Sequence, residues 1–289
     1  MKQSYSHCPG RVKKSPTTFT GKSAAEKTAM ISHPCWVDIG ADLRVAIFED
    51  ESCNSGYATR LWDCAIGLSR WMCGSLLDEK HTASEEGALC GWRVLEVGAG
   101  TGLCSLALLL IEPSAASVRV TDIDATALPL IRKAAGLLQT HGRSIERLHA
   151  SLFDICSDQP LPECDLLIAC DIMYTVELAA ALAKRCLEHL NHSSSACVIV
   201  ACGGRPARRI FLQALAEQNV HVMLEDVDAR LDTSPALSPA ALTFAEWLRA
   251  QDGDGAVGAA CRGRAGRMRV LNIENDARLF GISSVPVMF

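Results

Sequence analysis

Three clusters of residues in this sequence have the side chains that bind small molecules or take part in catalysis. The first is the run 94–102, VLEVGAGTG, in which an acidic residue is followed by glycines at alternate positions. Glycine has no Cβ, so the backbone there turns sharply and approaches a ligand closely. The second is Asp122, twenty positions after Gly102, and the third is the run 171–174, DIMY, which places a carboxylate near a phenol. Together they indicate a nucleotide-type cofactor next to a polar acceptor site.

The spacing of the glycines distinguishes between two kinds of cofactor. A dinucleotide-binding loop reads G-x-G-x-x-G, and its third glycine would fall at position 103, where this chain has Leu103. The chain instead reads G-x-G-x-G from Gly98, after the acidic Glu96. This spacing suits S-adenosylmethionine, whose amino-acid end lies against the loop and which has no pyrophosphate that needs a helix N-terminus. We therefore predict S-adenosylmethionine as the cofactor.

The two other clusters have an expected role and a structural alternative. Asp122 stands at the end of the next predicted strand, where a carboxylate accepts both ribose hydroxyls of the cofactor, and Asp124 is expected to cap the helix that follows. Asp171 and Tyr174 end the fourth predicted strand, beside the methyl group to be transferred. The alternative is that Asp171 caps the next helix while Tyr174 packs on the sheet.

The elements that position these residues alternate between strands and helices. Such alternation predicts a doubly wound α/β fold with a mostly parallel sheet and helices on both faces. Ligands then bind at the carboxyl ends of the strands. Strands are expected at 93–97, 118–121, 147–153, 165–170, 196–201, 220–227 and 268–273, and helices at 103–111, 125–139, 176–190 and 206–218. A hairpin at 36–48 and a helix at 57–74, closed by a glycine, precede them.

Composition divides the chain into a tail and one domain. Residues 1–34 are rich in Ser, Thr and Lys and lack periodicity, so we expect a disordered basic tail. Residues 35–289 form the predicted domain, with an insertion at about 229–267 that holds a short helix from 238 to 247 and a Gly/Ala-rich loop.

Charge and hydropathy exclude several classes of partner. Up to residue 35 the chain has six basic residues and one acidic residue, whereas the remainder has 22 basic and 32 acidic residues. An acidic body repels phosphate backbones and attracts basic protein segments, which disfavours nucleic acid. No apolar run reaches the roughly 20 residues of a membrane-spanning helix, so we predict a soluble protein with no membrane partner.

The cysteines indicate the compartment. Fourteen cysteines are scattered through apolar segments, and none forms a C-x-x-C pair. They are expected to act as small hydrophobic residues rather than as zinc ligands or disulfides, and no metal is predicted. A reducing compartment follows, and we expect a cytoplasmic location, with the nucleus as an alternative.

Taken together, these residues resemble a known family. The runs 61–63 (LWD), 95–102 (LEVGAGTG), 120–122 (VTD) and 171–174 (DIMY) are similar to those of the family-16 seven-strand protein-lysine N-methyltransferases of the methyltransferase-like 21 type. The resemblance covers roughly residues 36–225, and the D-x-x-Y element is its most specific part. It implies a seven-stranded class I, Rossmann-like methyltransferase fold and a monomer that acts on a protein substrate.

The resemblance also implies a role for each matching residue. Asp171 and Tyr174 would be the catalytic pair, and Cys170 stands where the family has a small residue against the cofactor. Where the family often has a tryptophan near adenine, this chain has Leu152 and Phe153, so one of these two would contact the base. The remaining cofactor contacts carried over are Trp62, Glu96, Gly98, Ala99, Gly100 and Asp122.

The expected reaction is direct transfer of the methyl group to a neutral lysine amine, with no covalent enzyme intermediate. A histidine, a protein N-terminus, a small amine or RNA stay open as acceptors, and Arg205, Arg208 and Arg209 keep RNA among them. Methylation of adenine or of a glutamine amide is disfavoured, because the Asn-Pro-Pro-aromatic element that grips a planar amide nitrogen is absent. A non-catalytic binding module that retains the fold is the third possibility.

Overall fold

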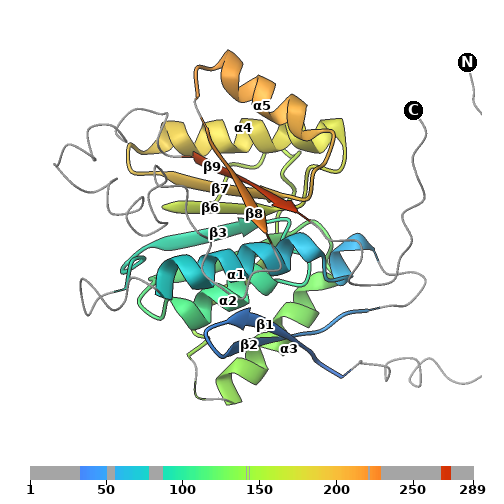
Figure 1. Ribbon diagram of the computed structural model, residues 1–289, viewed down its shortest axis with the longest axis vertical. Coiled ribbons are helices and arrows are strands. Elements are labelled where there is room, and N and C mark those ends of the chain that lie inside the picture. Colours follow the sequence, from blue (N-terminus) through green and yellow to red (C-terminus); the bar gives the residue numbers. More distant parts are fainter. Residues whose placement is uncertain are drawn as a thin grey trace, which may run out of the picture. The chain divides into compact units, whose positions relative to one another are not determined.

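The computed structural model describes residues 33–50, 56–77, 87–140, 142, 144–220, 222–228 and 268–274. Nine strands and six helical segments are defined in these ranges, and Figure 1 shows their arrangement. The strands are β1 (Cys35–Gly40), β2 (Leu43–Ile47), β3 (Arg93–Val97), β4 (Ser117–Asp122), β5 (Leu148–Leu152), β6 (Leu166–Cys170), β7 (Cys197–Cys202), β8 (Met223–Asp228) and β9 (Met268–Glu274). The helical segments are η2 (Tyr57–Thr59), α1 (Asp63–Leu77), α2 (Leu103–Ile111), α3 (Ala127–Thr140), α4 (Val176–His192) and α5 (Arg208–Glu217).

Seven of these strands form one sheet in the order β5-β4-β3-β6-β7-β9-β8. Each neighbouring pair is parallel, so the described sheet is wholly parallel. From β3 the chain proceeds to β4 and β5 on one side, and β6 then begins the other side. The strand order therefore reverses between β3 and β6, and in open α/β sheets a ligand binds at the carboxyl ends beside such a reversal. The predicted α/β class is confirmed.

Helices cover both faces of the sheet because its strands are apolar on both sides. In β3, Val94 belongs to one buried cluster, whereas Leu95 and Val97 belong to the other. The first cluster packs against α1, α2, α3 and the antiparallel β1–β2 hairpin, and the second packs against α4 and α5. Figure 1 shows α4 and α5 on the opposite side of the sheet from α1 and α2. Burial of this kind on two faces is what near-continuous apolar strands require.

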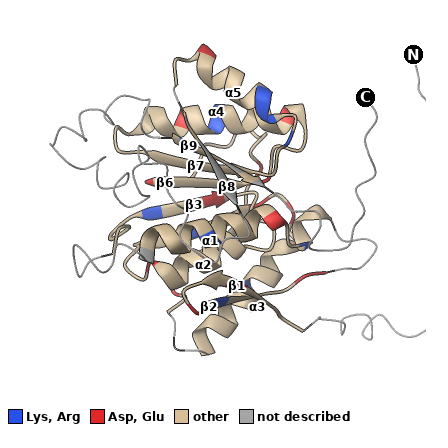
Figure 2. Cartoon of the chain, viewed as in Figure 1, with Lys and Arg blue, Asp and Glu red and all other residues tan. Residues whose placement is uncertain are grey.

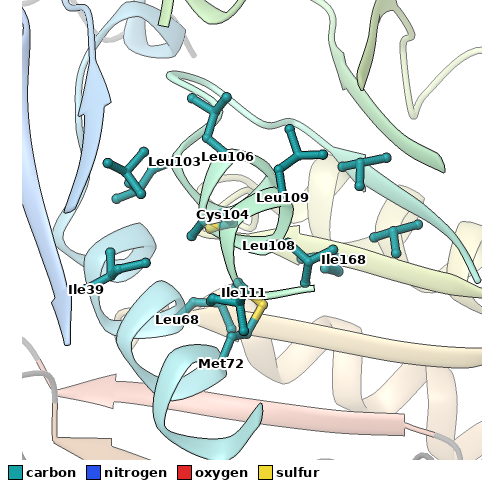
Figure 3. Packing of buried hydrophobic residues seen from close by; sticks show 14 of the residues in the cluster. Ile39, Leu68, Met72, Leu103, Cys104, Leu106, Leu108, Leu109, Ile111 and Ile168 are labelled. Carbon is teal, nitrogen blue, oxygen red and sulfur yellow. The ribbon is translucent and has the colours of Figure 1, made fainter. Parts of the chain in front are cut away.

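Helix α2 lies at the centre of the first cluster, as Figure 3 shows. Its sequence, LCSLALLLI, has no polar face, and eight of its nine residues are buried. A helix that is apolar all round must be enclosed on every side. Here β3 and β4, α1 and the hairpin enclose it, and this burial fixes the position of the glycine loop that directly precedes the helix.

The helix predicted at 57–74 is the clearest error of the sequence analysis. The structure divides it into η2 and α1, because Arg60 has extended backbone angles (φ −116°, ψ 146°). The helix also continues past Gly74 to Leu77, since Ser75 and Leu76 are buried against the core. The cost of an internal glycine, about 1 kcal/mol, is smaller than the gain from burying a leucine side chain.

Two predicted segments lie outside the described residues. They are the basic tail, of which only residues 33 and 34 are described, and the insertion at 229–267. Among the helices that are described, none has the length and hydropathy to cross a membrane. Figure 2 shows basic and acidic residues interspersed over the described strands and helices.

Candidate functional site

A cavity of about 610 Å³ opens at the carboxyl ends of the central strands. The loops after β3, β4, β5 and β6 form its walls, and η2 and the loop after β7 border it. Of the eleven site residues predicted from the sequence, ten line this cavity. Its lining residues are Tyr57, Ala58, Arg60, Trp62, Ala65, Glu96, Gly98, Ala99, Gly100, Thr101, Asp122, Ile123, Asp124, Phe153, Asp154, Ile155, Cys156, Cys170, Asp171, Ile172, Tyr174, Leu178 and Arg205.

The glycine loop has a backbone that only glycine adopts without strain. Gly98 and Gly100 have φ angles of 63° and 56°, in the left-handed region. A Cβ at Gly98 would lie 2.5 Å from Cγ2 of Ile172, so the space beside the loop is already filled by the segment after β6. The loop therefore brings bare backbone to the cavity wall, which suits the amino-acid end of S-adenosylmethionine.

Asp122 joins the loop to the end of β4. Its side chain is 4% exposed, and its two oxygens accept hydrogen bonds from the backbone N–H groups of Gly100 at 2.8 Å and Asp124 at 2.9 Å. Burial raises the pKa of this carboxyl group above its ordinary value. Each carboxylate oxygen keeps a second lone pair. The carboxylate is thus fixed in place and retains acceptors for the ribose hydroxyls.

Asp124 lies three residues before the first residue of α3, Ala127. Its side chain accepts hydrogen bonds from the backbone N–H of Thr126 at 2.9 Å and from the Thr126 hydroxyl at 2.6 Å. These bonds hold the turn that leads into α3, and the predicted role of Asp124 as the N-cap of this helix stays a prediction.

Glu96 is buried beneath the glycine loop. Its side chain is 1% exposed and accepts hydrogen bonds from Ser105, from the backbone N–H at 3.0 Å and from the hydroxyl group. Burial raises the pKa of Glu96 to about 7, although the bonds from Ser105 act in the opposite direction. The carboxyl group thereby ties the end of β3 to the first turn of α2, on either side of the loop.

At the end of β5, the structure distinguishes between the two residues predicted as alternatives for the contact with adenine. Phe153 is buried and lines the cavity, together with Ile123 and Ile155. Leu152 is 55% exposed and does not line it. Successive residues at a strand end point to opposite sides. Only one of the two therefore faces the cavity, and that residue is Phe153, while Leu152 is the one predicted site residue that the structure leaves out.

A buried arginine of α4 holds the loop after β5 in place. Arg185, 2% exposed, donates from Nε to the carbonyl oxygen of Ile155 at 3.0 Å and from another nitrogen to that of Ser157. It also forms an ion pair with Glu188 at 2.6 Å, and its guanidinium lies 5.3 Å from the centre of the Phe153 ring. The side of the cavity that Phe153 and Ile155 line is therefore shaped by a residue that lies outside the cavity.

At the opposite end, Asp171 directly follows β6. Its φ of 54° places it in the left-handed region, where aspartate is among the few residues that occur. Asp171 does not cap α4, because Thr175 does so by accepting from the N–H of Leu178. Instead, both carboxylate oxygens bind the guanidinium of Arg205, at 2.8 Å from Nε and 2.5 Å from Nη2. The structural alternative considered for Asp171 is therefore wrong.

Three aromatic residues, Tyr57, Trp62 and Tyr174, line the same cavity as Asp171. The ring of Tyr57 lies 6.0 Å from that of Trp62 and 6.2 Å from that of Tyr174. The Trp62 indole donates to the carbonyl oxygen of Tyr57 at 3.0 Å, and the guanidinium of Arg205 lies 5.7 Å from the Trp62 ring. Tyr174 is 53% exposed, so it does not pack on the sheet as the alternative proposed. We call Tyr57, Trp62, Tyr174, Asp171 and Arg205 the acceptor corner.

Thiol groups back the wall between the two ends. Cys170 lines the cavity, and its contacts with Cys104 and Cys64 raise the pKa of its thiol well above the ordinary value. Such a thiol is uncharged and inert, which agrees with the predicted small apolar residue at this position. Among the residues that the structure describes, no group of His, Cys, Asp or Glu side chains is arranged to hold a metal ion.

Several lining residues were not predicted. Tyr57 and Arg60 precede α1, and Asp154 follows β5. Arg205 comes directly after Gly203 and Gly204 at the end of β7. A polar residue that follows glycines at a strand end beside the strand-order reversal is a signal that would have indicated Arg205.

The chain was compared with known proteins. The model of the lysine methyltransferase family matches residues 41–218. A search of curated proteins returned no match. Solved structures that resemble the chain include a dimethyladenosine transferase from Plasmodium falciparum (22% identity, 40% of this chain and 36% of that one, TM-score 0.27). Another is the CurJ carbon methyltransferase (21% identity, 40% of this chain and 32% of that one, TM-score 0.27). A third is the YcgJ protein from Bacillus subtilis (17% identity, 41% of this chain and 44% of that one, TM-score 0.26).

The chain spans less than half the length of each of these solved structures, and TM-scores this low carry no argument. The family match is different, because it extends from the hairpin to the end of α5 and includes every predicted site residue. The cavity has a glycine loop, a buried carboxylate at Asp122 and apolar lining residues at Phe153, Ile123 and Ile155. The chain therefore belongs to the lysine methyltransferase family, whose methyl donor is S-adenosylmethionine.

Proposed function

We propose that this protein transfers a methyl group from S-adenosylmethionine to a lysine side chain of a protein substrate. The observation that carries the proposal is the acceptor corner, where a carboxylate and three aromatic rings meet at the mouth of the cavity. Aromatic faces and a carboxylate are the groups that bind an alkyl chain ending in an amine. The open mouth, where Tyr57 is 72% exposed, suits a side chain that projects from a large partner.

The residues that would hold the cofactor lie along the inner cavity. The loop at Gly98 and Gly100 would lie along its amino-acid end, Asp122 would accept the ribose hydroxyls, and Phe153 would pack on the base. When bound, the cofactor supplies an activated methyl group. The protein contributes alignment of donor and acceptor, which supplies several kcal/mol of acceleration.

At the acceptor corner, the remaining lone pairs of Asp171 accept hydrogen bonds from the N–H groups of the amine. These bonds orient the lone pair of the amine nitrogen. Tyr57 and Tyr174 exclude water from the methylene chain. A lysine near pKa 10.4 is mostly protonated at neutral pH, so its proton leaves to solvent before transfer. The acidic balance of residues 36–289 favours a basic substrate segment, and the cysteines scattered through apolar segments favour a reducing compartment and hence a cytoplasmic protein partner.

The test separates binding from transfer. Wild type and Asp171→Ala are titrated with S-adenosylhomocysteine by calorimetry, and each is then incubated with methyl-labelled S-adenosylmethionine and a cell extract. We expect Asp171→Ala to bind the cofactor within about threefold of wild type and to label no protein. Label that disappears on RNase treatment but survives protease treatment would instead indicate an RNA acceptor. If Asp171→Ala loses cofactor binding as well, the proposed roles of the two ends of the cavity are wrong.

A further inference from the structure

Arg205 introduces a positive charge where the proposed function requires an amine to bind. Its guanidinium forms two hydrogen bonds with Asp171, whose side chain is 7% exposed, and it lies near the ring of Trp62. This is the environment that a lysine ammonium would seek: a buried carboxylate beside an aromatic face. The cation that belongs to the protein already occupies it.

The pairing is fixed by the backbone as well as by charge. Arg205 lies in the loop after β7, and the N–H of Gly203 in the same loop also donates to Asp171, at 3.4 Å. The backbone N–H of Asp171 donates to the carbonyl oxygen of Ala201 at 2.9 Å. A bidentate guanidinium–carboxylate pair is the strongest geometry for such an interaction. The hydrogen bonds with Asp171 also raise the pKa of Arg205, so the guanidinium stays charged.

We propose that Arg205 makes the acceptor corner selective for the uncharged amine and excludes the protonated form. This inference rests on the proposed function and names the form of the substrate that the site accepts. Because Arg205 compensates the charge of Asp171, an entering ammonium gains no net attraction and meets the guanidinium at close range, where like charges disfavour the protonated form. A neutral amine still donates its N–H groups to the carboxylate. Arg205 is thus a positioning and specificity-determining residue.

Other titratable groups face the same corner from the surrounding elements. They include Cys64 of α1, Cys202 of β7, Tyr57 and Tyr174, Asp122 and Cys156 near Tyr174, and, further along the cavity wall, Arg60 and Glu96. Burial raises the pKa of both Cys202 and Tyr174, and that of Glu96 is about 7. A titration above about pH 8 therefore avoids Glu96. The remaining groups are common to wild type and every Arg205 variant, so a difference between these proteins reports on Arg205.

The test uses n-butylamine as an analogue of the lysine side chain and measures binding rather than transfer. The full-length protein is saturated with S-adenosylhomocysteine and titrated by calorimetry. Between about pH 8 and about pH 9.5 the neutral fraction of an amine with a pKa near 10.4 rises about 30-fold. We expect the apparent Kd of wild type to fall by about the same factor. Arg205→Gln should bind more tightly than wild type at the lower pH, with a Kd that changes less than about threefold.

Two further variants separate charge from structure. Arg205→Lys keeps the positive charge and should retain the pH dependence of wild type. Arg209→Gln removes an exposed arginine of α5 that lies outside the cavity lining and should also behave as wild type. Circular dichroism shows whether each variant is folded.

Three results would overturn the inference: a wild-type Kd that does not change with pH, no detectable amine binding at the higher pH, or the same pH dependence in wild type and Arg205→Gln. Since wild type alone gives the first two, the test does not depend on a folded variant. If the pH dependence is observed but no lysine is methylated, the proposed function fails and the inference stands. If lysine is methylated and amine binding is independent of pH, only the inference fails.

Discussion

Asp122 binds the backbone of Gly100 directly, with 2.8 Å between the carboxylate oxygen and the amide nitrogen. One carboxylate thus shapes the glycine loop and also lines the cavity, where we propose that it accepts the ribose hydroxyls. Asp122 is the last residue of β4, and Gly100 lies in the loop after the neighbouring strand β3, which is parallel to β4. The cofactor site therefore depends on this link as well as on its own direct contacts.

Asp122→Asn should weaken cofactor binding more than the loss of a single contact would. The asparagine side chain has one carbonyl oxygen and one NH2 group, so its NH2 group would face one of the two backbone N–H groups that donate to the carboxylate. Hydrogen bonds to a charged group contribute about 1.5–3 kcal/mol. We expect the Kd for S-adenosylhomocysteine, measured by calorimetry, to rise about 10- to 100-fold. Asp158→Asn, at a fully exposed side chain, should leave this Kd unchanged. Equal affinities for wild type and Asp122→Asn would show that the link is dispensable.

Gly98→Ala should abolish cofactor binding while leaving the rest of the fold intact. Its Cβ would come within 2.5 Å of Ile172, and its φ of 63° strains any residue that has a Cβ. The matched control is Gly142→Ala, where φ is 78° but no atom lies within 4 Å of the added Cβ. Both variants should lose about 1–2 kcal/mol of stability from the backbone strain. Only Gly98→Ala should lose affinity in the calorimetric titration, and a normal affinity would mean that the loop does not contact the cofactor.

Strand β3 and helix α2 could be predicted because the sequence patterns of both are unambiguous. The predicted ranges 93–97 and 103–111 coincide with β3 and α2, since a buried strand, a glycine loop and an apolar helix follow one another without overlap. The helix at 57–74 was less predictable, because its periodic apolar residues continue through a segment where Arg60 is extended. Periodicity shows which residues share a face, but it does not show where the backbone changes direction.

A site residue was predictable where its place at the end of a predicted strand is enough to put it in the cavity. Asp122 and the glycines follow directly from strand order. The choice between Leu152 and Phe153 was not predictable, since it depends on where β5 ends. The pairing of Arg205 with Asp171 was not predictable either, because the two residues are 34 positions apart and lie in the loops after two different strands, β7 and β6.

Arg185→Met should destabilise the protein and impair the adenine end of the cavity. The buried guanidinium donates to the carbonyl oxygens of Ile155 and Ser157 and pairs with Glu188, so its removal takes a donor from each of the two carbonyl oxygens. Glu188 loses the ion pair but keeps its hydrogen bond from the N–H of Leu161 at 2.8 Å. Hydrogen bonds to a charged group contribute about 1.5–3 kcal/mol each. We expect a decrease of about 3 kcal/mol in the free energy of unfolding by urea, together with weaker S-adenosylhomocysteine binding. Lys184→Met, at a neighbouring exposed side chain of α4, should change stability by less than about 0.5 kcal/mol.

Glu96 should make stability fall as pH rises through the weakly acidic range. Its pKa is about 7 in the folded protein, whereas an exposed glutamate has a pKa of about 4.3. Between these values the folded protein binds more protons than the unfolded chain, so the contribution of Glu96 is most favourable at low pH and is lost as pH approaches 7. The loss is on the order of 3 kcal/mol.

The comparison of wild type with Glu96→Gln isolates this contribution, because the other carboxyl groups are shared. Urea unfolding at about pH 5 and about pH 8 should show the stability of wild type falling relative to that of the variant. If the stabilities of wild type and Glu96→Gln change with pH in parallel, Glu96 titrates as an exposed carboxyl group does. Its burial beneath the loop would then not affect the pH dependence of stability.

The measurement that tests the central claim most directly is mass spectrometry of the methylated product. Purified protein is incubated with methyl-labelled S-adenosylmethionine and a cell extract, beside an Asp171→Ala control, and the labelled material is digested and sequenced. We predict label on a lysine side chain of a protein, absent from the control. Label on a histidine, on a protein N-terminus, on RNA or on a small amine would contradict lysine specificity. Label that is equally strong with Asp171→Ala would contradict the acceptor corner as the site of transfer.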